Sequence, residues 1–336
     1  MMEAAIPGQE NHREIPPTVS VIIPAYNAGK YIGEALKSIC DQTFVSHEAV
    51  VINDGSSDTE ELERALHGYP CAIQYIKQEN RGAAAARNAG LRAARGELVA
   101  FLDADDRWLP NFLEEQLSFL KLSNADLVYS DALLFGESPV HGRTFMELQP
   151  SRGAVTPESL LAVDVTVLTS AVLARKQPIL GVGLFDETIK RGHDFELWHR
   201  LARHGVRFAY QDKVLAEHRI VESGLSGNTF SQLERTLAVL ETIKTRKVLT
   251  PSEEAAYHLN YNRTLAELAV ETGKERLLSK DFAGALQSFN EAKKLRQSWK
   301  LMLVSLGVRI APEMLRRIYS RRDGAAKARR NRNAIR

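Results

Sequence analysis

The most restrictive stretch of this 336-residue chain is residues 98–106, where five apolar residues run directly into Asp-Ala-Asp-Asp. A short apolar run is typical of a strand buried on both faces, and acids at its carboxyl end lie where open α/β sheets bind ligands. Asp103 and Asp105 are two residues apart, so in an extended chain their side chains point the same way. Two such oxygen donors suit Mg²⁺ or Mn²⁺, and the metal could hold a diphosphate. The alternative is that the acids cap a helix opened by Trp108.

The rest of the first half alternates between expected strands and helices. This spacing predicts βαβ units, right-handed crossovers and a mostly parallel sheet flanked by helices. The ends of several strands then face one edge, where Tyr26, Asp54 and Asp103 can meet. The expected strands are residues 18–24, 48–53, 72–77, 98–102, 125–131 and 166–174.

Composition sets broad limits. The apolar fraction of 44% allows a sizeable core, and the net charge of +2 indicates no particular partner. Cys40 and Cys71 lack metal-ligand spacing, so we expect buried thiols of a reducing compartment. The first residues lack the apolar core of a signal peptide, and the longest apolar stretch, 301–308, falls short of the roughly 20 residues that span a bilayer. A soluble, cytoplasmic protein is therefore expected.

Two polar stretches near the strand ends each allow two interpretations. Residues 54–58, Asp-Gly-Ser-Ser-Asp, could cap a helix or could present a carboxylate to a base or ribose. Arg87 and Asn88 could lie on a solvated helix face or donate to a phosphate, which an arginine can bind with two hydrogen bonds.

Taken in order, four motifs resemble glycosyltransferase family 2, whose members are inverting, nucleotide-sugar-dependent enzymes of the GT-A fold. The resemblance covers roughly residues 19–224. The motifs are Val-Ile-Ile-Pro-Ala-Tyr-Asn at 21–27, Asn-Asp-Gly-Ser-Ser-Asp at 53–58, Asn-Arg-Gly at 80–82 with Ala-Arg-Asn-Ala-Gly at 86–90, and Phe-Leu-Asp-Ala-Asp-Asp at 101–106.

The resemblance implies roles for individual residues. Asp54 would contact uracil or its equivalent, Arg87 would lie near the diphosphate, Asp103 would face the ribose, and Asp105 would ligate Mn²⁺ or Mg²⁺. The loop at 24–26 would line the nucleotide. The full set implied to bind the nucleotide sugar is Pro24, Ala25, Tyr26, Asn27, Asp54, Gly55, Ser56, Arg81, Gly82, Arg87, Asn88, Asp103 and Arg219.

A second acidic site follows at residues 192–201, which resemble the family's Glu-Asp-x-Glu-Leu segment with His193 in place of the usual Glu. Asp194 matches the catalytic base, which takes the proton of the attacking hydroxyl while a metal stabilises charge on the leaving diphosphate. Asp194 could instead cap the following helix. His193 and Trp198 are candidate acceptor contacts, although a core position is the stronger alternative for Trp198.

Residues 214–220 resemble the family's strand that ends in Tyr-Arg-x-His. His218 stands at the Tyr position, Arg219 is kept, and Val221 replaces the final His. Arg219 could meet the diphosphate or pair with a surface acid. Residues 223–228 would then form a loop that closes over the donor.

We expect four regions: a flexible N-terminus (1–17), a GT-A domain (18–228), a helical region (229–314) and a basic tail (315–336). Gly273 and Phe289 partly match a tetratricopeptide-like hairpin, but a single incomplete copy favours a plain helical appendage.

The tail carries nine Lys or Arg against one acid. With the apolar stretch before it, this tail could lie on an anionic membrane or simply be solvated.

These features predict a metal-dependent inverting glycosyltransferase of cell-surface polysaccharide or lipid-linked glycan assembly. A UDP-sugar is the expected donor, a glycan or lipid-linked glycan the acceptor, and the inner face of the membrane a candidate location. Nucleic acid is not expected as a partner, because the tail has few aromatics. The alternative is a non-catalytic nucleotide-sugar-binding protein with a helical interaction module. A nucleotidyltransferase is disfavoured, because no glycine-rich, lysine-bearing phosphate loop is found.

Overall fold

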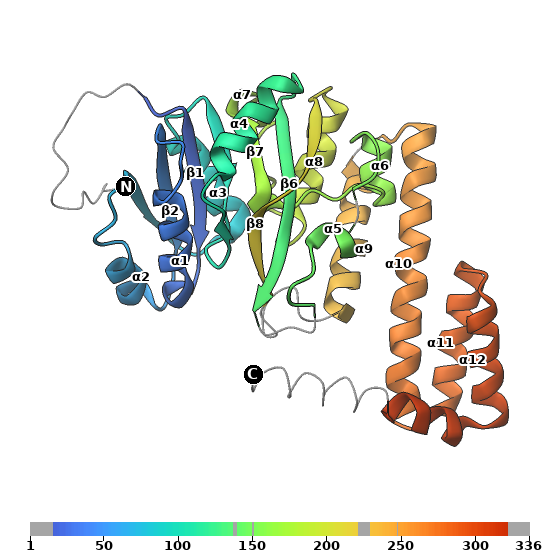
Figure 1. Cartoon of the computed structure of the whole chain (residues 1–336). Helices are drawn as coiled ribbons and strands as arrows, with labels where there is room; N and C mark the ends of the chain where they lie inside the picture. The colour runs from blue at the N-terminus through green and yellow to red at the C-terminus, as the bar shows by residue number, and fades with distance from the viewer. Residues whose placement is uncertain (1–15, 137–139, 150, 221–228, 247, 322–336) are drawn as a thin grey trace. The chain divides into compact units, whose positions relative to one another are not determined.

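The computed structural model describes residues 16–136, 140–149, 151–220, 229–246 and 248–321 (Figure 1). The chain forms two compact units. Of the described residues, unit 1 comprises those up to Phe135 together with those between Gly142 and Arg219, and unit 2 comprises those between Gly136 and His141 and those from Ile220 onward. The predicted closing loop at 223–228, Val221 and most of the basic tail lie outside the described residues.

Unit 1 is built on one eight-stranded sheet in the order β3-β2-β1-β4-β7-β6-β8-β5. The pairs β1–β2, β1–β4 and β2–β3 are parallel, as the βαβ pattern predicts, whereas β4–β7, β6–β7 and β5–β8 are antiparallel. The sheet is therefore mixed, with its parallel half formed by the first four strands. The strands are β1 (Val19–Ala25), β2 (His47–Asp54), β3 (Ile73–Gln78), β4 (Leu98–Phe101), β5 (Arg107–Trp108), β6 (Leu127–Gly136), β7 (Val172–Arg175) and β8 (Phe208–Ile220).

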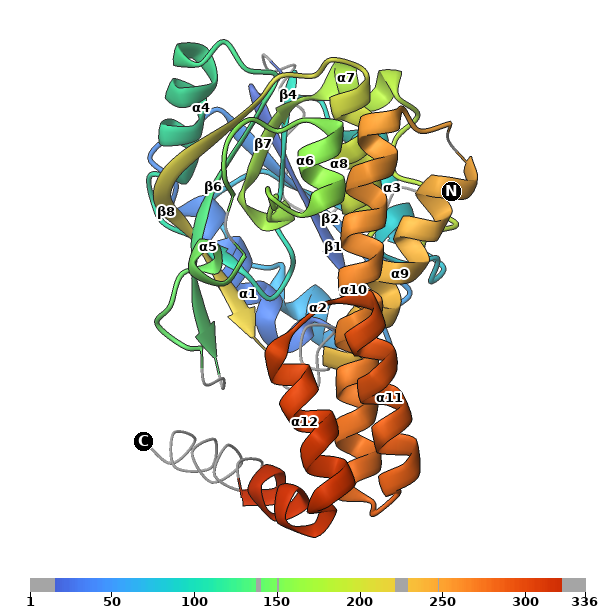
Figure 2. The same cartoon turned by 90° about the vertical axis from the view of Figure 1, so that its right-hand side faces the viewer.

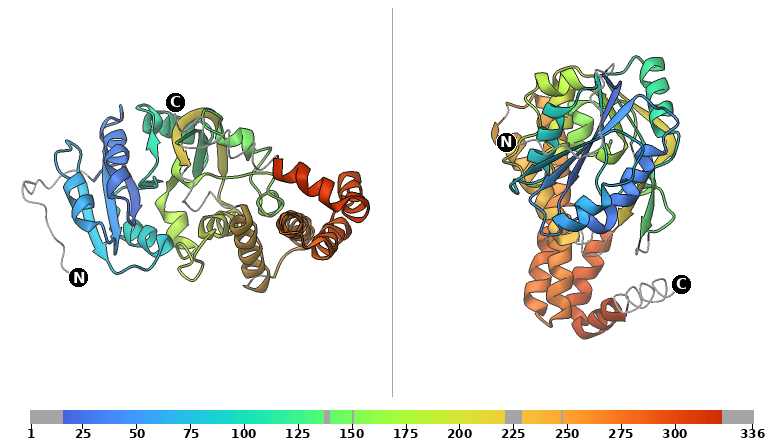
Figure 3. Two further views of the ribbon diagram at one scale, coloured as in Figure 1. Left: turned by 90° about the horizontal axis from the view of Figure 1, so that it is seen from below. Right: turned by 90° about the vertical axis from the view of Figure 1, so that its left-hand side faces the viewer.

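Helices cover both faces of this sheet (Figure 3). Successive side chains of β1 alternate between two cores: Val21 and Ile23 pack with α1, and Ile22 packs with α3. A Cβ at Gly90 of α3 would lie 2.6 Å from Ile22 Cγ2, so a glycine is needed for this close approach. The helices are α1 (Gly29–Cys40), α2 (Thr59–Ala65), α3 (Ala83–Ala93), α4 (Phe112–Leu122), α5 (Phe145–Leu148), α6 (Pro157–Ala162), α7 (Lys176–Gly181) and α8 (His193–Arg203).

Two expectations for unit 1 are corrected. Cys40 and Cys71 are not free thiols but form a disulfide with Cα atoms 5.2 Å apart, so they no longer support a reducing compartment. Folding brings together residues whose sequence separation of 31 gave no sign of pairing. The strand expected at 166–174 is confined to β7, because Thr169–Ala171 forms a 3-10 turn. Ser170 in that turn accepts hydrogen bonds from Asp103 N (3.2 Å) and Trp108 Nε1 (2.7 Å).

Unit 2 is helical, with α9 (Thr229–Arg246), α10 (Pro251–Leu278), α11 (Phe282–Leu295), α12 (Trp299–Ile310) and a further helical segment at 312–321 (Figure 2). Thr250 and Glu253 form a capping box that begins α10. Gly273 allows α10 and α11 to approach, because a Cβ there would lie 2.8 Å from the Phe289 ring. No helix in the described part of the chain is long and apolar enough to cross a membrane.

Candidate active site

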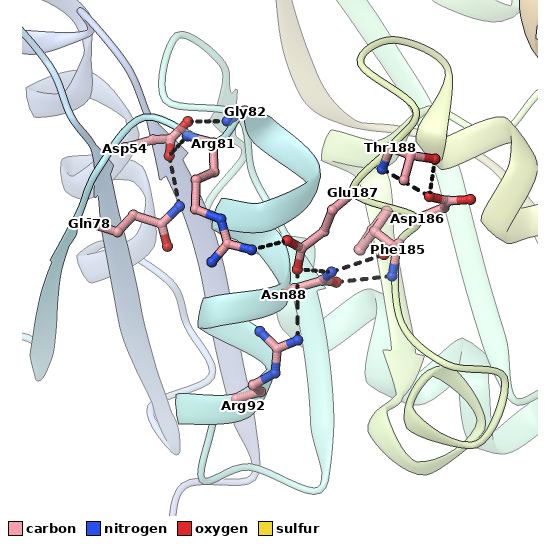
Figure 4. Close-up of polar contacts among 10 residues, drawn as sticks. All are labelled: Asp54, Gln78, Arg81, Gly82, Asn88, Arg92, Phe185, Asp186, Glu187 and Thr188. Atoms are coloured by element: carbon pink, nitrogen blue, oxygen red, sulfur yellow. Dashed lines mark hydrogen bonds and ion pairs between the residues drawn. The ribbon is translucent and has the colours of Figure 1, made fainter. Parts of the chain in front are cut away.

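The first component of the site is Asp54, the last residue of β2. Its carboxylate is buried and accepts hydrogen bonds from Arg81 N (2.9 Å), Gly82 N (2.8 Å) and Gln78 Nε2 (2.7 Å) (Figure 4). These donors belong to β3 and to the loop that leads into α3. Because both carboxylate oxygens are bound by the chain itself, Asp54 fixes the loop that places α3 against the sheet edge.

The loops after β1 and β2 are joined by their own side chains. Asn27 Oδ1 accepts hydrogen bonds from Ser57 N (2.8 Å) and Ser57 Oγ (3.0 Å), and Ser56 Oγ accepts one from Asn27 N (3.1 Å). Asp58 accepts from Gly29 N (2.8 Å) and makes no side-chain hydrogen bond that caps α2. Asp58 is the N-cap residue of α2, as the helix-cap interpretation predicts, but its side chain binds Gly29 at the start of α1 and not the helix that it begins. Tyr26 is 56% exposed at the edge of this pair of loops, which leaves its ring available for stacking.

A glycine is required within this edge. Gly55 has a φ of +70°, and a Cβ on it would lie 2.6 Å from Asn80 N. A larger residue would therefore be strained by its backbone conformation and would push away the loop that Asp54 binds.

The acids after β4 form the second component. The N-cap of α4 is Asn111, so these acids do not cap that helix. Burial and the neighbouring charges of Asp106 and Asp103 raise the pKa of Asp105 to about 7. Three neighbouring acids therefore gather negative charge after β4, whereas the carboxylate of Asp54 is surrounded by hydrogen-bond donors.

Asp106, the residue after Asp105, is paired with His218. Asp106 is fully buried and accepts hydrogen bonds from His218 Nδ1 (2.9 Å) and Arg219 N (2.8 Å), which hold the end of β8 against the end of β4. Burial opposes a charge on His218, but Asp106 outweighs it, and the pKa of His218 is raised to about 9. A protonated His218 thus offsets one of the three acids.

The residues fit a divalent cation in part. Hard carboxylate oxygens and excess negative charge at Asp105 favour Mn²⁺ or Mg²⁺. Within the described residues, no group of three or more His, Cys, Asp or Glu side chains is arranged to hold a metal. The remaining ligands would therefore come from a diphosphate and water, which is the usual manner of binding Mg²⁺.

Arg87 on α3 connects the acids after β4 to α8. Its guanidinium is buried, with one terminal nitrogen 2.5 Å from Asp103 Oδ1 and the other 2.6 Å from His193 Nε2. Because arginine only donates, the Nε2 of His193 accepts and its proton lies on Nδ1. Burial and the positive charge of Arg87 lower the pKa of His193, which favours the neutral ring.

Asp194 occupies the first turn of α8, whose N-cap is Gly192, so the carboxylate is not the cap. Asp194 Oδ2 accepts from Thr169 Oγ1 (3.0 Å), and Oδ1 accepts from Phe195 N (2.9 Å). Burial alone would favour protonation, but the positive charge of Arg87 and these hydrogen bonds hold the pKa of Asp194 below its usual range. The carboxylate is therefore ionised at neutral pH and able to accept a proton.

Three other predicted residues have contacts that the sequence did not reveal. Asn88 exchanges hydrogen bonds of 2.9 Å with the backbone of Phe185 in both directions, so it holds a turn rather than facing solvent. Trp198 is 2% exposed and packs edge-on against Phe101 and Phe185, which follows the core alternative. His193 is likewise buried, against Arg87.

Arg219 contacts the backbone of Asp105 and pairs with a surface acid, as one of its two alternatives predicts, while its contact with the diphosphate stays a prediction. Its Nε donates to Asp105 O (2.9 Å), and a terminal nitrogen donates to Glu34 (2.8 Å) on α1. Its guanidinium lies 4.3 Å from the centre of the Phe135 ring.

Glu187 was missed by the sequence analysis. It accepts from Arg81 (2.6 Å) and Asn88 (3.0 Å) and pairs with Arg92 at 3.7 Å (Figure 4). It thereby ties the segment before α8 to α3. The sequence around Glu187 gave no signal of this role, because its partners lie about a hundred residues earlier in the chain.

Comparisons with known proteins agree with this arrangement. A family model described as glycosyl transferase family 2 matches residues 20–158. An uncharacterized glycosyltransferase of Rickettsia typhi is 31% identical over 266 residues, covering 76% of this chain and 79% of that protein. The chain therefore belongs to glycosyltransferase family 2, which confirms the family predicted from the four motifs.

Two further proteins extend the comparison. The chain is 29% identical to the Escherichia coli UDP-Glc:alpha-D-GlcNAc-diphosphoundecaprenol beta-1,3-glucosyltransferase WfgD, over 72% of this chain and 91% of that protein. The mannosyltransferase PcManGT from Pyrobaculum calidifontis, solved with GDP-Man and Mn²⁺, is 19% identical with a TM-score of 0.61, over 96% of this chain and 87% of that chain. The second likeness confirms the predicted GT-A fold.

Proposed function

We propose that this glycosyltransferase inverts the anomeric carbon as it moves a hexosyl group from a nucleotide-diphosphate sugar to a hydroxyl of a lipid-linked glycan. The observation that carries the proposal is the Arg87 bridge. Arg87 contacts Asp103, beside the acid that would bind the metal, and His193, beside the candidate base Asp194. Through these two direct contacts, Arg87 connects the acids that would bind the donor and its metal with the segment that carries the candidate base, all within unit 1.

In this proposal each end has its own task. Asp194, ionised and held by Thr169, takes the proton of the attacking hydroxyl. The loops that Asp54, Asn27 and Ser56 fix in place would receive the nucleotide, with Tyr26 beside the base. Asp105 would hold Mn²⁺ or Mg²⁺, which when bound stabilises negative charge on the leaving diphosphate, and Asp103 would face the ribose. Arg87 and Arg219 would lie near that diphosphate.

The relatives support the choice of donor, metal and acceptor. The name of WfgD gives UDP-glucose as its donor and a diphosphoundecaprenol-linked sugar as its acceptor. PcManGT was solved with a nucleotide sugar and Mn²⁺. We therefore propose a UDP-sugar donor, a divalent metal and a lipid-linked acceptor for this chain, with a place in cell-surface polysaccharide assembly at the inner face of the membrane.

The decisive experiment separates donor binding from transfer. A panel of UDP-, GDP- and dTDP-sugars is first screened for Mn²⁺-dependent thermal stabilisation, because a ligand that binds only the folded state raises its stability. Asp194→Asn is then expected to retain donor binding by calorimetry while lowering transfer by about 10²–10⁴-fold, the usual contribution of a general base.

One control variant and two contrary outcomes make this result interpretable. Asp212→Asn, an exposed acid on β8, should leave both measurements unchanged. Full turnover by Asp194→Asn would show that another group takes the proton. Donor binding without turnover by the unaltered protein, across all lipid-linked acceptors tried, would favour the non-catalytic alternative.

A further inference from the structure

Helix α12 has an unusual surface: it is apolar on both sides. Its inner side packs Val308, Val304 and Leu301 against the core that α10 and α11 form around Phe289. A helix with one buried stripe normally carries polar residues on the opposite side. Here the opposite side is exposed and apolar, consisting of Trp299, Met302, Leu303, Leu306 and Ile310.

These five residues form one continuous stripe. At 100° per residue their positions fall within about 100° of arc, directly opposite the buried positions. Their exposure is large, with Trp299 at 66%, Met302 at 56% and Ile310 at 74%. A contiguous apolar stripe of this kind marks an interaction surface, whereas isolated exposed apolar residues do not.

The helical segment at 312–321 repeats the pattern. Leu315 and Tyr319 pack on the same core as α12, while Met314 and Ile318 are exposed. The exposed residues again lie four positions apart, so they share one face of the helix. We refer to the exposed apolar residues of both helices as the apolar strip; its members are Trp299, Met302, Leu303, Leu306, Ile310, Met314 and Ile318.

The charges around the apolar strip are almost all positive. Residues 299–321 contain Lys300, Arg309, Arg316, Arg317 and Arg321 against Glu313 alone. Glu313 pairs with Arg316 at 2.9 Å. Further basic residues follow, since the segment 315–336 has nine Lys or Arg and a single acid.

We propose that the apolar strip lies in the surface of a membrane that contains anionic phospholipid. Leu, Met and Ile side chains would enter the boundary between headgroups and acyl chains, with Trp299 at the level of the headgroups. The lysine and arginine side chains would extend to the lipid phosphates. An apolar stripe flanked by basic residues matches this partner in both hydrophobicity and charge, and it would hold the enzyme where a lipid-linked acceptor is found.

The main test is flotation of the full chain with vesicles at about 0.15 M salt, where long-range surface attraction is already screened. We expect binding to phosphatidylethanolamine–phosphatidylglycerol vesicles and little binding to phosphatidylcholine vesicles. Leu303→Glu with Leu306→Glu should lower the partition coefficient about tenfold or more, because two apolar side chains no longer enter the lipid. Arg317→Glu with Arg321→Glu should weaken binding to the anionic vesicles alone.

The chain offers a matched control and an internal probe. Leu259→Glu alters an exposed leucine on α10 (62%), outside the apolar strip, and this variant should bind like the unaltered protein. Of the three tryptophans, Trp108 and Trp198 are buried and Trp299 is exposed. Brominated lipids should therefore quench Trp299 emission in the unaltered protein, and Trp299→Phe should remove that signal. This readout holds even if a glutamate variant unfolds.

Three results would overturn the proposal. These are the absence of binding to anionic vesicles, binding that the Leu303→Glu and Leu306→Glu pair leaves intact in a folded protein, and a dimer in solution that this pair dissociates. The last result would assign the strip to a second copy of the chain. None of these measurements uses a donor or acceptor, so their failure would leave the proposed reaction standing.

Discussion

Asp54 ends one strand of the sheet and Asp105 follows another that runs in the same direction, yet their surroundings are opposite. Asp54 is bound by two backbone N–H groups and one amide side chain. Asp105 instead has Asp103 and Asp106 as neighbours, and its pKa is raised to about 7. Asp54 therefore stabilises the fold through its hydrogen bonds. The negative charge of Asp105, in contrast, lies beside two other acids and is only partly balanced by positive groups of the chain.

The largest effect on stability is expected at Asp54. Asp54→Ala removes three hydrogen bonds to a buried carboxylate and leaves the N–H groups of Arg81 and Gly82 without their partner. The free energy of unfolding should fall by roughly 2–4 kcal/mol, as measured by urea denaturation.

The matched control for that prediction is Asp58→Ala, four residues further along. Asp58 accepts one hydrogen bond, from Gly29 N. This variant should lose only about 1 kcal/mol. An equal loss in the two variants would contradict the structural role assigned to Asp54.

Asp105 should behave in the opposite way. Asp105→Asn removes a buried charge, so without metal at pH 8 the free energy of unfolding should rise by roughly 1–3 kcal/mol. The folded protein holds a proton on Asp105 that the unfolded chain has lost, and stability should therefore fall as pH rises from about 4 to 7 in the unaltered protein but not in the variant. Urea denaturation in EDTA, at pH 8 and at steps between pH 4 and 7, measures both effects.

Added Mn²⁺ completes the comparison. It should raise the melting temperature of the unaltered protein and leave Asp105→Asn unchanged. Without metal, Asp103→Asn should lower the stability of the protein, unlike Asp105→Asn, because the carboxylate of Asp103 is paired with Arg87. If Asp105→Asn proved less stable than the unaltered protein, the idea of an uncompensated charge would be wrong.

A smaller effect than at Asp54 or Asp105 is expected at His218, which partly compensates the same cluster. Its pKa is raised to about 9 in the folded state, so its stabilising contribution is complete below about pH 6.5 and is lost as pH rises toward 9. His218→Gln should lower the free energy of unfolding by about 1–2 kcal/mol at pH 6. Between pH 7 and 9 the variant should lose less stability than the unaltered protein does. Chemical denaturation at these pH values tests the sign; a variant with the original pH profile would contradict it.

The sequence by itself determined the parallel half of the sheet and the order of the acidic strand ends. Short β-branched runs alternating with amphipathic helices specify βαβ units locally, and parallel strands bring Asp54 and Asp103 to one edge. The four motifs also sufficed to predict the family. Asp194 could be singled out only through its match to the family's segment, and its role as the base stays a prediction.

Only the tertiary structure decided which side chains meet. Arg87 and His193 are 106 residues apart, as are Arg81 and Glu187, and Cys40 and Cys71 were not expected to pair. The exposed side of α12 likewise emerged only when packing showed which of its apolar faces the core uses. Local patterns fix backbone conformation because their interactions span a few residues, whereas contacts between distant side chains depend on the packing of the whole sheet and its helices.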